Sequence, residues 1–280
     1  DALPISLERV DLDLDGVEEV FLHNDAIQVV MAEDGAAAVR EFDAYALKHN
    51  FGDTLRRQPE HYYRKIQLQE GARQHKLWEE GIASAHDRVS FKHVITPADL
   101  VFDDYGRALF LDAVVAGSGE RLPVRDYAAE LRRREGTLEY RSVANHLNKV
   151  IGVEGSRLQV SYHFHGKTHQ EFSTEINLAM PSCDGPAGRY VHRGEVPCGF
   201  GQQLELEGMS ELVLEDDVMG GKLILRTSRP ARLVGRPHFT VSQSEAGFEK
   251  IMQAVVLTLS WGVGSHPQPI EVSLEVVPKP

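Results

Sequence analysis

The sequence predicts a mainly β fold: a large antiparallel β-sandwich with one or two short helices. From Ile151 onward, short runs rich in β-branched and aromatic residues alternate apolar with polar positions, as half-buried strands do. Gly, Pro, Asp and Ser separate these runs at regular spacing, which favours an antiparallel sandwich over an α/β fold. Amphipathic helical segments are scarce.

The first half of the chain supplies two predicted strands and the predicted helices. Residues 20–22 and 26–31 alternate as short strands around a polar turn at 23–25. Residues 56–71 carry a proline near their start and a glycine at their end, which predicts one amphipathic helix. Residues 126–134 are predicted to form a second short helical or charged segment.

The second half is predicted to be strand-rich throughout. The expected strands are residues 158–164, 171–178, 203–206, 222–226, 239–241, 254–261 and 270–277. No Pro/Gly/Ser-rich linker and no fixed-period repeat interrupts the chain. We therefore expect one domain spanning residues 1–280.

Composition and charge narrow the class of partner. The 280 residues carry a net charge of −12, which argues against nucleic acid because phosphate binding draws on clustered Lys and Arg. The one basic run, residues 132–134, lies between two glutamates and indicates a solvated charged face. No apolar stretch approaches the ~20 residues of a membrane span, so no membrane partner is expected.

The lack of a secretory signal pattern and the small number of cysteines predict a cytoplasmic location. No basic segment followed by an apolar one suggests a secretory signal. Cys183 and Cys198 do not make a disulfide framework; two reduced thiols are expected, with a single bridge as the alternative. Because the chain begins at Asp1 and not at Met, we expect that an upstream segment was removed.

An acidic loop near the start is a candidate calcium site. Asp11, Asp13 and Asp15 alternate before Gly16, and Glu19 follows. Ca²⁺ takes six to eight oxygen ligands, and alternating Asp side chains on a tight loop supply several of them. The glutamate of an EF-hand's twelfth position is missing, so this would be a shorter, strand-associated loop. The alternative is a solvated acidic turn without metal.

A second candidate site lies on two predicted strands. His163 and His165 are two residues apart, so their side chains point to one face of their strand. With Glu175 and Asn177 on the following strand, they are predicted to line a polar concavity; the family resemblance given below implies that this concavity binds carbohydrate. A His and a carboxylate would also suit proton transfer at an anomeric centre. The alternative is a half-exposed strand face without a ligand.

Several segments, in order along the chain, resemble the C-terminal region of family 57 glycoside hydrolases, the group of certain α-amylases and 4-α-glucanotransferases. These are Asp11–Val20 with Asn24–Asp25, Glu41–Asp43, His49–Asn50, Asp53–Arg57, Pro59–Glu60, Tyr62–Lys65, Ser84–Asp87, Asp103–Arg107 leading to Phe110–Asp112, Glu175–Leu178 and Thr240–Glu249. The last block is the most specific. His238 stands at a position that is usually apolar in the family.

The resemblance implies a galactose-mutarotase-like supersandwich that accompanies a separate N-terminal catalytic barrel. No counterpart of the barrel's catalytic carboxylates stands in this chain, so no catalytic residue is carried over. We therefore expect an accessory C-terminal domain acting in α-glucan metabolism, joined to such a barrel and in contact with α-glucan or maltooligosaccharide. Two alternatives stay open: a stand-alone carbohydrate-binding module, and a mutarotase-like sugar-modifying enzyme using His163 or His165 with Glu175.

Overall fold

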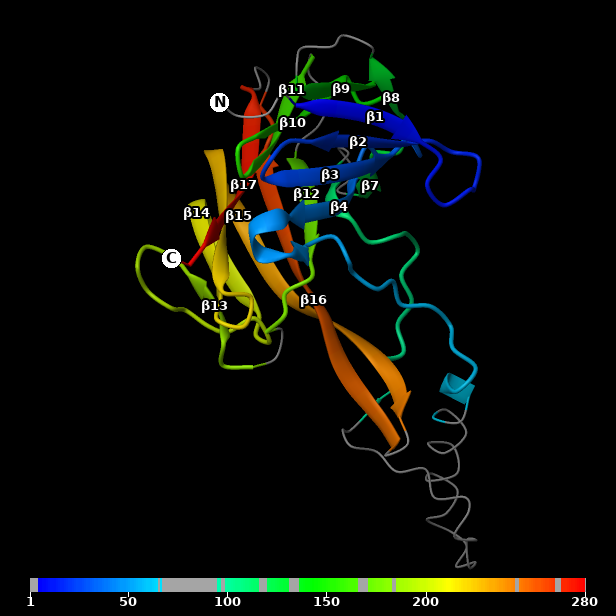
Figure 1. Cartoon of the computed structure of the whole chain (residues 1–280), viewed down its shortest axis with the longest axis vertical. Coiled ribbons are helices and arrows are strands. Elements are labelled where there is room, and N and C mark those ends of the chain that lie inside the picture. Colours follow the sequence, from blue (N-terminus) through cyan, green and yellow to red (C-terminus); the bar gives the residue numbers. More distant parts are fainter. Residues whose placement is uncertain are drawn as a thin grey trace, which may run out of the picture. The chain divides into compact units, whose positions relative to one another are not determined.

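The computed structural model describes residues 5–64, 66, 95–96, 99–115, 120–130, 136–165, 171–182, 185–244, 247–264 and 268–279. Strands dominate this part of the chain (Figure 1). They are β1 (Ser6–Val10), β2 (Glu19–His23), β3 (Ile27–Ala32), β4 (Val39–Ala44), β5 (His49–Asn50), β6 (Leu109–Val115), β7 (Arg121–Pro123), β8 (Tyr127–Glu130), β9 (Thr137–Ser142), β10 (Leu147–Glu154), β11 (Arg157–Phe164), β12 (Glu171–Leu178), β13 (Gly188–Val191), β14 (Leu204–Asp216), β15 (Gly221–Ser244), β16 (Gly247–Gly262) and β17 (Ile270–Pro278).

The strands pair antiparallel and form two facing layers. In one layer, β1 to β4 form a meander, β4 contacts β6, and β6, β12 and β16 follow side by side. In the other, the order is β8, β9, β10, β11, β17, β15, β14 and β13. The Tyr162 ring of β11 lies 4.6 Å from the Phe172 ring of β12, so the layers meet there. The predicted antiparallel sandwich is confirmed.

Chain contacts divide the chain into two compact units. Unit 1 comprises Asp1–Thr54, Ala108–Pro237 and Ala254–Pro280, and unit 2 comprises Leu55–Arg107 and His238–Gln253. Unit 1 contains the two facing layers. Unit 2 has a small core of its own, made of Tyr63, Ile66, Leu100, Val241 and Phe248. The single domain expected for residues 1–280 stays a prediction.

Both helix predictions need correction over their described part; residues 65, 67–71 and 131–134 of these predictions lie outside the described residues. Residues 56–60 are irregular, and helical geometry occurs only at Tyr63, Arg64 and Ile66 among the described residues of the predicted helix. Pro59 disfavours helical geometry at Gln58, the residue before it, and the Arg57 amide donates to the Asp103 carboxylate and not to a helical carbonyl. In the other segment, Tyr127–Glu130 is strand β8, because it pairs with β9. Among the residues that the structure describes, the one named helix is a 3₁₀ turn, Tyr45–Leu47.

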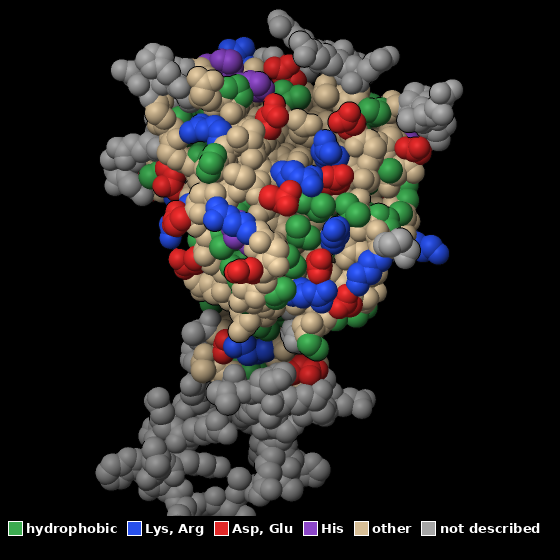
Figure 2. All heavy atoms as spheres, turned by 90° about the vertical axis from the view of Figure 1, so that its left-hand side faces the viewer, with side chains coloured by type: hydrophobic (Ala, Val, Ile, Leu, Met, Phe, Trp, Pro, Cys, Tyr) green, Lys and Arg blue, Asp and Glu red, His purple; other side chains and the backbone are tan. Residues whose placement is uncertain are grey.

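Figure 2 shows basic and acidic side chains interspersed on one face, with no block of a single sign. None of the helices in the described part of the chain is long and apolar enough to cross a membrane. Cys198 is a free cysteine, whereas Cys183 lies outside the described residues. A cytoplasmic location stays a prediction.

Candidate functional site

A buried ionic cluster joins the two layers of unit 1. Lys149 of β10 donates from Nζ to Asp112 Oδ2 of β6 at 2.8 Å and to the carbonyl oxygen of Phe110 at 2.7 Å. The hydroxyls of Tyr127 and Tyr162 donate to the same carboxylate at 3.0 and 2.8 Å. All four side chains are buried, and burial lowers the pKa of Lys149, opposed by the charge of Asp112. Each oxygen of the Asp112 carboxylate therefore accepts a hydrogen bond from another side chain of the protein.

The backbone of β6 is shaped to complete this cluster. The pairing of β6 with β12 shifts register between Glu175 and Ile176, which leaves Phe110 as an extra residue. Phe110 adopts φ +64°, an uncommon geometry for a bulky residue. Its carbonyl oxygen accepts the Lys149 hydrogen bond, so the bulge supplies the third polar partner of the ammonium group.

Two of the four residues predicted to bind sugar lie together on β12. Asn177 Nδ2 donates to Glu175 Oε1 at 3.0 Å and to the carbonyl oxygen of Ala108 at 2.8 Å. Both side chains are buried. Thr174, one position from Glu175, contacts the Tyr162 hydroxyl in the interior, so Glu175 and Asn177 point to the opposite face of β12.

The two histidines lie elsewhere. Tyr162 of β11 points inward toward β12, so its neighbour His163 points outward, away from β12. His165 follows the end of β11 and is exposed. Because His163 and Glu175 point away from each other on facing layers, the four predicted residues form two separate groups and not one concavity.

The predicted calcium loop brings three carboxylates together. Ligand oxygens of Asp11, Asp13 and Asp15 lie within 4.8 Å of one another. These oxygens also accept backbone hydrogen bonds: Asp11 from Asp15 and Gly16, Asp13 from Asp15, and Asp15 from Val17. Glu19 is buried and accepts from the Leu12 amide at 2.8 Å, so it anchors the loop. Calcium binding by this loop stays a prediction.

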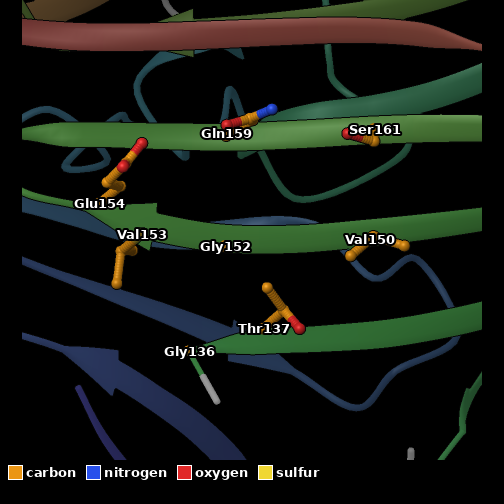
Figure 3. Close-up of a pocket in the computed structure, with 8 residues that line it drawn as sticks. All are labelled: Gly136, Thr137, Val150, Gly152, Val153, Glu154, Gln159 and Ser161. Carbon is orange, nitrogen blue, oxygen red and sulfur yellow. The ribbon is translucent and has the colours of Figure 1, made fainter. Parts of the chain in front are cut away.

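The outer face of the β9–β10–β11–β17–β15 layer is hollowed at two adjoining places. One hollow, of about 220 Å³, is lined by Gly136, Thr137, Val150, Gly152, Val153, Glu154, Gln159 and Ser161. Figure 3 shows that these residues come from three neighbouring strands. The other, of about 240 Å³, is lined by Arg157, Gln159, Arg226, Thr227, Ser228, Glu271 and Ser273. Gln159 lines both hollows, and His163 lies on the same face of β11, four positions along.

Comparison with known proteins assigns the chain to a family. A family model described as "Alpha-amylase/4-alpha-glucanotransferase, C-terminal" matches residues 11–274. The chain belongs to this family. A protein of Pyrococcus furiosus named alpha-amylase is 26% identical in an alignment of 271 positions that covers 90% of this chain and 37% of the relative. A 4-alpha-glucanotransferase of Thermococcus kodakarensis is 26% identical in an alignment of 274 positions that covers 90% of this chain and 38% of the relative.

Solved structures extend the same relationship to the fold. The 4-alpha-glucanotransferase of Thermococcus litoralis superposes with a TM-score of 0.67 at 20% identity, covering 99% of this chain and 42% of that one. A galactose mutarotase-like protein of Clostridium acetobutylicum gives 0.55 at 8% identity, covering 98% and 99%. The galactose-mutarotase-like supersandwich is thereby confirmed as the fold. The chain spans about two fifths of the length of the relatives named alpha-amylase and 4-alpha-glucanotransferase.

Lys149, Asp112 and Gln159 were not among the site residues predicted from the sequence. A usable signal existed for Lys149, since Leu147, Lys149 and Ile151 share one strand face, and a lysine between two apolar residues on that face indicates a buried partner. Asp112 likewise lies among apolar residues. Gln159 gave no local signal, because its surroundings depend on which strands pair with β11.

Proposed function

We propose that this chain serves as the non-catalytic C-terminal domain of an α-glucan-processing protein. The observation that carries the proposal is the family match over residues 11–274, in relatives of which this region makes up only about two fifths. Those relatives are named alpha-amylase and 4-alpha-glucanotransferase. The remaining part of such proteins would hold the reaction, and this chain would support it.

The carboxylates of unit 1 support a non-catalytic role. Retaining glycoside hydrolysis needs two carboxyl groups about 5–5.5 Å apart that face the substrate. Among the described residues, the buried Asp112, Glu175 and Asp216 accept hydrogen bonds from neighbouring protein groups. Each of the two hollows has one acidic lining residue, Glu154 in one hollow and Glu271 in the other. Hydrogen bonds of this kind give the three buried carboxylates a structural role.

Unit 2 offers a surface suited to docking on a catalytic domain. Leu55, Val101, Phe102 and Tyr105 are exposed although large and apolar, and Arg56 is exposed beside Leu55. Aromatic residues and arginine are enriched in protein interfaces, and exposed apolar side chains that lie close together mark interaction sites.

The segments that carry these side chains are held firmly. Asp103 accepts hydrogen bonds from the Arg57 amide at 2.8 Å and from the Arg57 and Arg107 guanidinium groups at 2.7 and 2.6 Å. Burial opposes the charged form of Asp103, but these hydrogen bonds outweigh it and hold its pKa well below the usual range. A preorganised surface of this kind loses little entropy when a partner binds.

The test of the proposed function is an activity assay of the 280-residue chain alone. Incubated with maltoheptaose, the chain is expected to release no shorter sugars and to build no longer ones, as followed by chromatography. The N-terminal part of the Thermococcus litoralis enzyme, which this chain does not match, is then added and complex formation is measured by sedimentation. Turnover of maltoheptaose by the chain alone would contradict the non-catalytic role. In the sedimentation experiment, Phe102→Asp should weaken the complex between the chain and the N-terminal part.

A further inference from the structure

The two outer hollows are joined by one row of residues that runs across five strands. Strand register places Thr137 opposite Gly152, Gly152 opposite Gln159, Gln159 opposite Ser273, and Ser273 opposite Arg226. These residues all point to the outer face, because their neighbours Ile151, Leu158 and Leu274 are buried inside. Four interstrand spacings of ~4.8 Å give the row a length of ~19 Å.

A glycine keeps the row open at its second position. Gly152 lies inside β10, where glycine weakens a strand unless a bend or a close approach requires it. Its backbone does not adopt positive φ, so no turn explains it. A Cβ at this position would lie 3.0 Å from Thr137 Cγ2 and would narrow the floor between Thr137 and Gln159. Glycine within a strand often marks a place where a ligand approaches the backbone closely.

Three polar side chains in and beside the row have no hydrogen-bond partner in the described part of the chain. Gln159, Ser161 and Ser273 are half-buried, and their side chains make no hydrogen bond to any group in the described part of the chain. The Nε of Arg157 is buried and also lacks a partner there. An amide and two hydroxyls present donors and acceptors side by side, which matches the hydroxyl groups of a sugar. Partly buried polar groups without partners favour a ligand that supplies them.

The charges around the row are balanced. The lining of the two hollows contains two arginines, Arg157 and Arg226, and two glutamates, Glu154 and Glu271. Arg226 is already paired with Glu211, at 2.8 Å, and with Glu275. A phosphate site would need an excess of positive side chains, and a metal-ion site an excess of negative ones. A neutral polyhydroxylated ligand needs none.

We propose that the row Thr137–Gly152–Gln159–Ser273–Arg226 is the floor of a binding groove for a neutral linear oligosaccharide that lies across the strands. The ligand class expected first is an α-1,4-glucan, which rests on the proposed function. Gln159 and Ser161 hydrogen-bond the sugar hydroxyls near the centre of the groove. Gly152 lets a ring approach the sheet, and Arg226, paired with Glu211 and Glu275, borders one end of the groove.

The experiment titrates the whole chain with maltoheptaose, and in parallel with cellohexaose, by calorimetry and by ¹⁵N-edited NMR. We expect saturable binding of maltoheptaose, with chemical-shift changes concentrated in β10, β11 and β17. The double variant Gln159→Ala/Ser161→Ala should raise the Kd about tenfold or more, because it removes the hydrogen bonds of two side chains to the sugar and each of them contributes to the affinity. Gly152→Val should weaken it at least as much by filling the groove floor.

The matched control is Gln203→Ala, which removes an exposed glutamine outside both hollows and should change Kd less than about twofold. Thermal melting checks that each variant is folded, and the shift map of the unchanged chain locates the site without any variant. The proposed groove is overturned if neither sugar binds. It is also overturned if the chemical-shift changes on binding lie outside β10, β11 and β17. Binding of cellohexaose alone supports the groove but removes the α-glucan part of the proposed function.

Discussion

The two faces of strands β10 and β11 carry polar residues with opposite roles. On the inner face, Lys149 and Tyr162 are buried and both donate to Asp112. On the outer face, one position away along β11, Ser161 and then Gln159 are half-buried, and their side chains have no partner among the described residues. The same backbone therefore presents a closed polar cluster on one side and an open polar row on the other.

This difference separates polar groups that stabilise the fold from polar groups that are available to a ligand. Burial without partners costs free energy, so an interior polar residue persists where its partners are complete. On a half-open face water satisfies the same groups, and a ligand can replace that water with little loss. The two faces should therefore respond to substitution in opposite ways: the inner face through stability, the outer face through binding.

The largest expected effect is on the inner face. Lys149→Met leaves the Asp112 carboxylate buried without its counter-charge, and we expect the free energy of unfolding to fall by ~3–5 kcal/mol. Urea denaturation followed by circular dichroism measures this. The matched control is the double variant Lys149→Met/Asp112→Leu, which removes both charges and should recover a large part of the loss. A single variant as stable as the wild type would show that the ion pair does not stabilise the interior.

The position of Lys149 illustrates what sequence reasoning could and could not predict. Two-residue periodicity is enough to place β11, β12 and β17, because each of these strands is built of apolar residues on one face. It also places Gln159 and His163 on a shared face. It does not reveal that β10 and β11 face β6 and β12, since that depends on pairings between residues far apart in sequence. The sugar site predicted from His163 and Glu175 needed that information, and the two residues point apart.

The next effect concerns His238, a buried side chain of unit 2 whose surroundings disfavour the charged form. His238 Nε2 lies 2.9 Å from the carbonyl oxygen of Leu55, and burial together with the positive charge of Arg107 lowers the pKa of His238 to about 4. The folded pKa is thus below the ordinary value of 6.5, so stability is complete above pH 6.5 and falls as pH drops from 6.5 to about 4.

We expect this acid loss to reach ~2 kcal/mol once solvent screening is allowed for. His238→Gln keeps a donor for the Leu55 carbonyl but does not titrate in this range. Thermal melting at pH 7, 5.5 and 4 should therefore show a shallower acid decline in the variant than in the wild type. Parallel declines in the two proteins would show that His238 does not control acid stability.

A smaller stability effect tests the face of β12 that was predicted to bind sugar. Asn177→Ala removes two hydrogen bonds that its buried amide donates, one to Glu175 and one to the Ala108 carbonyl, so we expect the free energy of unfolding to fall by ~1–3 kcal/mol. Maltoheptaose affinity should stay unchanged, whereas Gln159→Ala should lower the affinity without changing the melting temperature. If the two variants exchange these effects, the comparison of closed and open polar groups fails, and the sugar site belongs to Glu175 and Asn177.

The smallest expected effect concerns the acidic loop, which tests whether carboxylates that already accept backbone hydrogen bonds still take a ligand. If Asp11, Asp13 and Asp15 bind Ca²⁺, free calcium at ten times its Kd should stabilise the chain by ~1.4 kcal/mol, and EDTA should reverse the gain. Asp13→Asn keeps the oxygen that accepts from the Asp15 amide but removes one charge, so the calcium-dependent rise in melting temperature should shrink. Magnesium at equal concentration is the control for ionic strength. A rise of equal size with both ions, or none with either, would mean that the backbone amides alone satisfy the loop and that it is a solvated acidic turn.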